Sequence, residues 1–284
     1  MSNNNHFVST QRSAVSVRLR LVAVAGLLVG AQIFALSLRA AEPAPTNTID
    51  MSVQVGQALS GALDLMSAGK LDEAAAALQQ LRQSPLNDYE LSRVLQQSVN
   101  LAITQARHQD AVNDSEALLE TSSLSDSERT SATLMLGKLY LQLENWSKGV
   151  EALLQANERQ PGNAETLYLL GFGHYRLQQP AMAIQWLEQA VAVNAAQAGE
   201  PVYSLLGVLY VDTKDYAKAV TTYETLVNST PAPVQAESYH STLAQLYVQT
   251  GNNGKARSTL QLLIDNYPAS GRSADYRQRL AALK

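Results

Sequence analysis

The sequence predicts an all-α protein built from repeated helix pairs, and three observations support this prediction. From Val53 onward, apolar residues recur with the period of an amphipathic helix, and no segment alternates as a strand would. Proline falls between the apolar segments, where helices end, at Pro85, Pro161, Pro201, Pro231 and Pro268. A leucine followed by a small residue recurs at Leu136-Gly137, Leu170-Gly171, Leu206-Gly207 and Leu243-Ala244, at spacings of 34, 36 and 37 residues. A repeat of this length is typical of a solenoid.

The spacing of these repeats resembles the tetratricopeptide repeat, whose pattern is W-x2-L-G-x2-Y…A-x3-F…P over about 34 residues. The first clear copy has Thr133, Leu136-Gly137, Tyr140 and Gly149-x3-Leu153. Three further copies follow in phase, with His174, Tyr210 and Tyr247 at the position of Tyr140. The resemblance implies a right-handed superhelical solenoid, in which each helix pair stacks on the next.

Two weaker copies precede the clear ones, around Leu71–Leu81 and His108–Leu118. We therefore expect about six repeats over residues 55–270, followed by a polar-faced capping helix at Arg272–Leu283. Ser125-x-x-Glu128 has the spacing of a capping box and predicts the start of the third repeat's first helix. Residues 197–199 and 232–234 lengthen the spacing beyond 34 residues, and we expect them to lie in loops between repeats.

Close packing explains the small residues of the motif. Glycine or alanine at Gly137, Gly171, Gly207 and Ala244 lets the first helix of a pair approach the second. Ala183, Ala219 and Ala256 supply the facing small surface, and Leu153, Leu187, Tyr223 and Leu260 fill the space beyond.

The N-terminus has the features of an export signal or a membrane anchor. Residues 1–40 contain four arginines and no acid, and residues 21–38 form an apolar run followed by small residues. A cleaved signal is favoured over an uncleaved anchor, because the run is short and rich in glycine and alanine. Both interpretations export the body and predict a periplasmic location. The predicted domains are a signal or anchor at 1–40, a linker at 41–52 and the solenoid at 53–284.

Composition excludes several classes of protein. The chain has 284 residues, 21 Lys+Arg, 25 Asp+Glu and a formal net charge of −4, which argues against a nucleic-acid binder. Zero cysteines exclude disulfides, thiolate zinc sites, cysteine catalysis and a lipid-modified cysteine.

No motif predicts catalysis. The sequence has no H-E-x-x-H, no G-x-S-x-G and no phosphate loop, so we expect neither an enzyme nor a cofactor or metal site. After residue 40 the histidines are His108, His174 and His240, and the last two occupy motif positions that are normally aromatic, which favours packing.

The resemblance places the binding surface in a concave groove lined by the first helix of each pair. The groove residues mapped in this way are Leu134, Met135, Lys138, Tyr168, Leu169, Phe172, Tyr175, Arg176, Leu205 and Val208. Only Lys138 and Arg176 are basic, so the groove departs from the subgroup that holds a chaperone's C-terminal carboxylate. The three aromatic residues could stack on a proline-rich segment, or they could pack against neighbouring first helices.

The predicted partner is an envelope protein or an extended segment of one, with contact to a membrane only through an uncleaved N-terminus. The stretch from Tyr203 to Ala219 resembles exported repeat proteins associated with TonB-type energy transducers, which implies an accessory scaffold of outer-membrane transport. The C-terminus resembles repeat proteins of Tol–Pal and outer-membrane assembly systems. Alternatives are an accessory factor of envelope assembly, cell division or polysaccharide export, and a hydrolase or carbohydrate-binding protein on the same fold.

Overall fold

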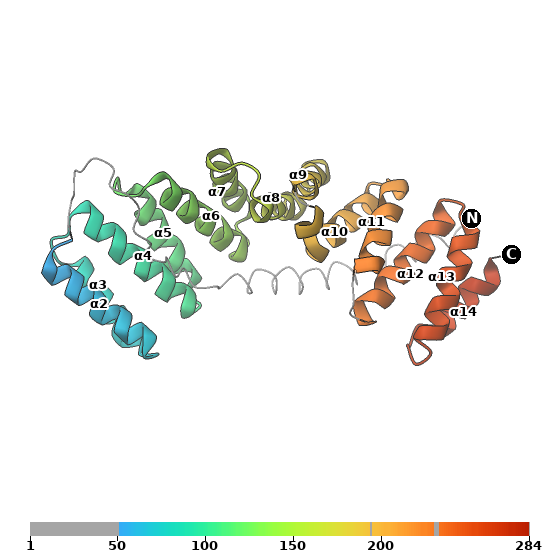
Figure 1. Cartoon of the computed structure of the whole chain (residues 1–284), viewed down its shortest axis with the longest axis horizontal. Coiled ribbons are helices and arrows are strands. Elements are labelled where there is room, and N and C mark those ends of the chain that lie inside the picture. Colours follow the sequence, from blue (N-terminus) through green and yellow to red (C-terminus); the bar gives the residue numbers. More distant parts are fainter. Residues whose placement is uncertain (1–50, 194, 230–232, 284) are drawn as a thin grey trace. The chain divides into compact units, whose positions relative to one another are not determined.

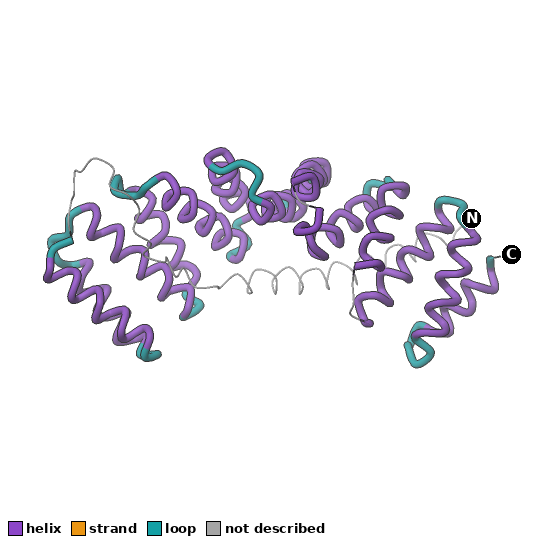
Figure 2. Tube along the Cα trace, viewed as in Figure 1, coloured by secondary structure: helices purple, strands orange, loops and turns teal. Residues whose placement is uncertain are grey.

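The computed structural model describes residues 51–193, 195–229 and 233–283, and every element in this part of the chain is a helix (Figures 1 and 2). The expected signal segment, and the linker up to residue 50, lie outside the described residues. No helix in the described part is long and apolar enough to cross a membrane. The helices are α2 (Val53–Ser67), α3 (Leu71–Arg82), α4 (Asp88–Thr104), α5 (His108–Glu120), α6 (Asp126–Gln142), α7 (Trp146–Arg159), α8 (Ala164–Arg176), α9 (Pro180–Val193), α10 (Ala195–Asp212), α11 (Tyr216–Ser229), α12 (Pro233–Gln249), α13 (Asn253–Asn266) and α14 (Ser273–Ala282).

The described residues form two compact units. The N-terminal unit, up to Pro161, stacks the pairs α2/α3, α4/α5 and α6/α7. The C-terminal unit, from Gly162, stacks α8/α9, α10/α11 and α12/α13 and ends with α14. Successive helices pack antiparallel within each unit, so the predicted all-α solenoid of helix pairs is confirmed.

Each helix pair is joined by a tight turn that contains one residue of positive φ. The six residues are Gly69, Ala106, Glu144, Gln178, Lys214 and Gly251, with φ between 55° and 76°. In the α6/α7 turn, the Asn145 N–H donates to the Tyr140 carbonyl at 2.8 Å across this residue, and the same bond recurs in the α12/α13 turn. The left-handed residue and this bond together end the first helix as a Schellman motif does.

The predicted capping box at the start of α6 is confirmed. The Ser125 side chain accepts from the Glu128 N–H, and the Glu128 carboxylate accepts from the Ser125 N–H. An equivalent box that was not predicted from the sequence opens α4 and is formed by Asn87 and Glu90. One break lies inside α10, at Gly199 (φ 67°, ψ 175°), within the extra residues expected between repeats.

The predicted contact between small and large residues is present in the pairs that carry a glycine. A Cβ placed on Gly137 would lie 2.8 Å from Leu153 Cγ, and one on Gly171 would lie 2.5 Å from Leu187 Cγ. At Gly207 the nearest atom would be Tyr223 Cε2, at 2.9 Å. Leu153 and Leu187 are fully buried, so the paired helices are as close as their backbones allow.

The C-terminal helix α14 closes the stack of the C-terminal unit. Its Tyr276 is fully buried and joins a cluster with Ala244, Leu260 and Leu263. On the opposite side of α14, Arg277 and Gln278 are exposed. The helix therefore covers the apolar side of α13 and presents polar residues to solvent, as a solenoid cap requires.

The variant Gly171→Leu tests the packing within a pair. The new side chain would overlap Leu187 and the Ala183 carbonyl, so we expect the free energy of unfolding to fall by about 1–3 kcal/mol or more. Chemical denaturation measures this loss. The matched control is Gly254→Ala in α13, where an added Cβ meets no atom within 4 Å and stability should not fall. Equal stability of Gly171→Leu and wild type would contradict the predicted register, in which Gly171 of α8 faces Leu187 of α9.

Candidate functional site

The predicted groove residues fall on the first helices of three pairs and are divided between the two units. Leu134, Met135 and Lys138 lie on α6 of the N-terminal unit and are half-buried. Met135 packs against a buried cluster that includes Leu136 and Leu139, so part of its side chain serves the core. The seven other residues lie on α8 and α10 of the C-terminal unit, whose first helices contact each other.

Three of the groove residues in the C-terminal unit are buried. Leu169, Phe172 and Leu205 expose 2%, 4% and 1% of their surface, so they pack inside the protein and offer little area to a partner. Packing was one of the two roles expected for the aromatic residues, and Phe172 packs in this way. The prediction of a binding role remains for the half-buried residues.

Four residues of α8 and α10 remain half-buried: Tyr168, Tyr175, Arg176 and Val208. The Tyr168 ring stacks on that of Phe172, with centroids 6.5 Å apart, and burial raises the pKa of Tyr168 to about 12. The Arg176 guanidinium lies 5.8 Å from the Phe172 ring centroid, within the range of a cation–π interaction. Together these residues form a surface with aromatic, aliphatic and cationic groups, which we call the first-helix surface.

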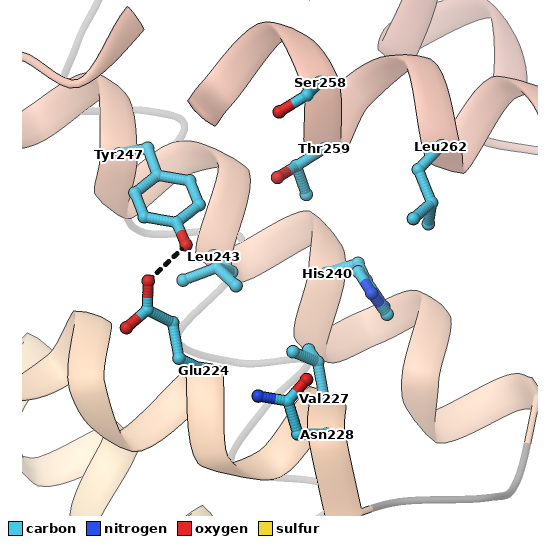
Figure 3. A pocket seen from close by; sticks show the side chains of 9 residues that line it. All are labelled: Glu224, Val227, Asn228, His240, Leu243, Tyr247, Ser258, Thr259 and Leu262. Atoms are coloured by element: carbon cyan, nitrogen blue, oxygen red, sulfur yellow. Dashed lines mark hydrogen bonds between the residues drawn. The ribbon is translucent and has the colours of Figure 1, made fainter. Parts of the chain in front are cut away.

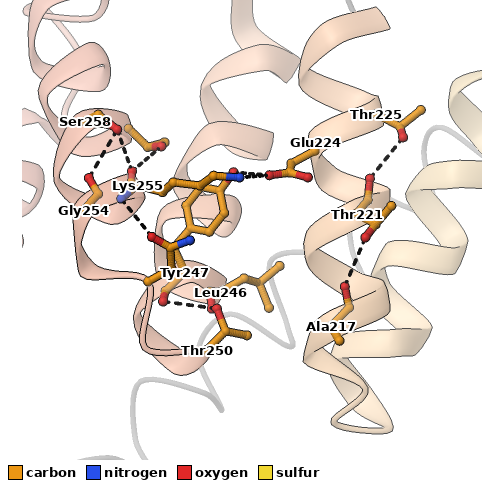
Figure 4. A network of polar contacts seen from close by, with 12 residues as sticks. Ala217, Thr221, Glu224, Thr225, Leu246, Tyr247, Thr250, Gly254, Lys255 and Ser258 are labelled. Atoms are coloured by element: carbon orange, nitrogen blue, oxygen red, sulfur yellow. Dashed lines mark hydrogen bonds and ion pairs between the residues drawn. The ribbon is translucent and has the colours of Figure 1, made fainter.

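A second constellation recurs between neighbouring repeats and consists of a tyrosine, a glutamate and a lysine. In the last pair, the Tyr247 hydroxyl of α12 donates to Glu224 Oε1 of α11 at 2.6 Å. The Lys255 ammonium of α13 lies 2.8 Å from the same oxygen and 5.2 Å from the Tyr247 ring centroid. Figure 4 shows these three side chains meeting between the helices. We call each such set a Tyr–Glu–Lys cluster.

The same cluster occurs twice more. Tyr210, Glu188 and Lys218 repeat it with a hydroxyl-to-carboxylate distance of 2.7 Å and an ion pair of 2.7 Å. The other copy lies in the N-terminal unit, where Tyr140 donates to Glu116 and the Lys148 ammonium lies 5.1 Å from the Tyr140 ring centroid. Each cluster connects the second helix of one pair to both helices of the next.

A variant of the Tyr–Glu–Lys cluster connects the capping helix α14 to α12. Tyr276 of α14 donates to Glu237 of α12 at 2.8 Å, and Arg272 takes the place of the lysine at 3.3 Å. On α8 the tyrosine is replaced by His174, whose Nδ1 lies 2.6 Å from Gln179 Oε1 within its own pair. The motif tyrosines were predicted from the sequence, but the clusters were not. The available signal was a lysine eight residues after Tyr140, Tyr210 and Tyr247.

Two of the clusters lower the pKa of their carboxyl groups. Bonds from Lys218 and then Tyr210 lower the pKa of Glu188, and bonds from Lys255 and then Tyr247 lower that of Glu224. Both shifts run opposite to the raised pKa that a carboxyl group needs in order to act as a general acid near neutral pH. In the described part of the chain, no group of three His, Asp or Glu side chains could hold a metal ion.

The comparisons with known proteins agree with this geometry. Three family models described as Tetratricopeptide repeat match residues 134–201, 200–233 and 242–270. These ranges overlap all four copies predicted from the sequence, and that prediction is confirmed. A search of curated proteins gave no match.

Solved structures show the same fold at low sequence identity. A tetratricopeptide repeat protein from Parabacteroides merdae is 17% identical, with a TM-score of 0.54, over 76% of this chain and 80% of that one. MamA from Desulfovibrio magneticus is 17% identical, with a TM-score of 0.53, over 63% and 96%. YrrB, described as a tetratricopeptide repeat protein with an unusual peptide-binding site, is 18% identical, with a TM-score of 0.52, over 68% and 92%. The chain therefore carries tetratricopeptide repeats and has the fold of a tetratricopeptide-repeat protein.

The cluster carboxylates predict how stability depends on pH. A carboxyl group whose pKa is lower in the folded chain stabilises it above the unfolded pKa, near 4.5 here, and this contribution disappears as pH falls through the folded pKa. We expect the free energy of unfolding to decrease from about pH 5 to about pH 3, and to decrease less steeply in Glu188→Gln/Glu224→Gln. Urea denaturation at several pH values measures how steeply the free energy of unfolding changes with pH in the wild type and in the variant. Identical slopes would show that the clusters do not contribute.

Proposed function

We propose that this protein is a non-catalytic scaffold that binds a segment of another protein through its first-helix surface. The fold supports this proposal, because tetratricopeptide repeats generally bind protein or peptide partners. The observation that carries it is the mixed surface of Tyr168, Tyr175, Arg176 and Val208, which are half-buried on contacting first helices. Aromatic and arginine side chains of this kind are enriched in the parts of interfaces that contribute most to affinity.

We further propose that the protein works in the periplasm and that its partner belongs to the bacterial envelope. The support is the N-terminal sequence, in which four arginines and an apolar run precede the repeats. Within the envelope, we propose a TonB-type transport system as the one served. An extended proline-rich segment suits half-buried aromatic side chains, since such a segment loses little conformational entropy on binding.

A capture experiment tests the scaffold function. The full chain, tagged and crosslinked in a periplasmic and membrane extract, is compared with the variant Tyr175→Ala/Arg176→Ala/Val208→Asp. We expect the captured envelope protein to decrease about tenfold or more, because each tenfold loss of affinity corresponds to only about 1.4 kcal/mol. Phe172 is left unchanged, since replacing a buried phenylalanine with alanine costs about 3–5 kcal/mol and would confuse binding with folding.

The control is Gln261→Ala/Asp265→Ala, which removes two exposed residues of α13 outside the first-helix surface. Helicity by circular dichroism should be equal in all three proteins. Undiminished capture by the first-helix variant would place the binding surface elsewhere. Lys138→Ala tests separately whether α6 of the N-terminal unit takes part.

A further inference from the structure

A pocket lies in the C-terminal unit, apart from the first-helix surface, between the second helices α11 and α13 and above α12. Its volume is about 350 Å³. Figure 3 shows Glu224 and Tyr247 at one side of the pocket and His240 and Leu262 at the other, with Leu243 between them. The lining residues are Glu224, Val227, Asn228, His240, Leu243, Tyr247, Ser258, Thr259 and Leu262.

Four of the pocket's polar side chains, those of His240, Tyr247, Ser258 and Thr259, direct a proton at an acceptor of the protein. The Ser258 and Thr259 hydroxyls donate to the Lys255 carbonyl at 3.0 and 2.8 Å. The Tyr247 hydroxyl donates to Glu224. His240 Nδ1 lies 2.7 Å from the Ala236 carbonyl, which can only accept, so Nδ1 carries a proton.

These four side chains leave lone pairs for a ligand, and the Asn228 amide adds one carbonyl acceptor beside its two N–H donors. The two hydroxyl oxygens can accept, as can Nε2 of His240 in its neutral form. Glu224 uses Oε1 for both Tyr247 and Lys255, so Oε2 remains as a charged acceptor. The acceptors come from three different helices, and Val227, Leu243 and Leu262 form apolar walls beside them.

The combination of these acceptors with apolar walls occurs in the last repeat and is not repeated in the one before it. Counted from the tyrosine, glutamate and lysine of each cluster, the preceding repeat has Tyr203 where this one has His240, and Ala192 where it has Asn228. Thr225 corresponds in the same way to Leu262. The motif position of His240 normally holds an aromatic residue, so the smaller imidazole both makes space and adds an acceptor.

We propose that this pocket binds the side chain of an arginine presented by a partner protein. A guanidinium group has five N–H donors and no acceptor, which matches several acceptors that converge from different helices. The aliphatic stem of arginine would lie against Leu243 and Val227, and the guanidinium would face the Glu224 side. A lysine ammonium matches less well, because it is a compact point charge with only three donors.

The neighbouring Lys255 sets the expected strength. Its ammonium is already paired with Glu224, so the pocket has little net charge and attraction from a distance is weak. We therefore expect a single arginine to bind with a Kd on the order of 1 mM, and a partner to gain further affinity from its other contacts.

The test uses the full chain and follows the imidazole resonances by NMR while N-acetyl-arginine amide is added to about 20 mM, well above a Kd of ~1 mM. We expect the His240 resonance to shift and saturate. N-acetyl-citrulline amide, which is neutral and of similar shape, should bind about tenfold more weakly, since charge-assisted hydrogen bonds are roughly twice as strong as neutral ones. No shift of His240, or equal binding of both probes, would overturn the proposal.

Two variants locate the site. His240→Tyr introduces the residue of the preceding repeat and should abolish the binding of N-acetyl-arginine amide, followed by other pocket resonances. Glu224→Gln should weaken binding about tenfold, whereas the matched control Glu188→Gln, which disrupts an equivalent cluster outside the pocket, should leave it unchanged. If His240→Tyr fails to fold, Asn228→Leu serves the same purpose, because it places a larger apolar side chain in the pocket. Binding that survives all pocket variants would overturn the proposal, and none of them alters the first-helix surface.

Discussion

The close approach of the two helices within each pair is the constraint on which the rest of this structure depends. A small residue on the first helix faces a large one on the second, and at Gly171 the backbone leaves no room even for a Cβ beside Leu187. This contact determines which side of each helix is buried. It also brings the C-terminus of the first helix close to the N-terminus of the second. The tight turn between them contains one residue of positive φ, which ends the first helix. Pairs built in this way leave an apolar face uncovered, so they must stack.

The Tyr–Glu–Lys clusters then determine how neighbouring pairs stack. Because each cluster draws its glutamate from the preceding second helix and its tyrosine and lysine from the following pair, a shift of one pair along the next would separate the glutamate from both partners. Their energies are modest individually, since the lysines are largely exposed. They contribute direction, because a buried tyrosine hydroxyl needs an acceptor and finds it in the glutamate of the preceding pair. The cap uses the same chemistry with an arginine.

Much of this architecture could be predicted from the sequence, because helical period, helix-ending prolines and repeated small residues act locally. The capping box at Ser125 and the contact of Gly137 with Leu153 follow from spacing alone. The clusters were missed because each glutamate lies 22 to 32 residues before its tyrosine and lysine, and the contact depends on how pairs stack. The groove was predicted from motif positions, which give the helix but not the depth of a side chain. Leu169, Phe172 and Leu205 thus lie on the expected helices but are buried. The pocket at His240 needed the structure, since its acceptors come from three helices.

A double-mutant cycle between Gly171 and Leu187 tests the central constraint most directly. Unfolding of Gly171→Ala, Leu187→Ala and the double variant would be followed by the fluorescence of Trp186, in the same pair, in a Trp146→Phe background. If the two residues are in forced contact, truncating Leu187 makes room for the added methyl group. The double variant should then lose at least ~1 kcal/mol less stability than the sum of the single losses. Additive losses would contradict the account, because they would show that residue 171 and the Leu187 side chain are not in forced contact.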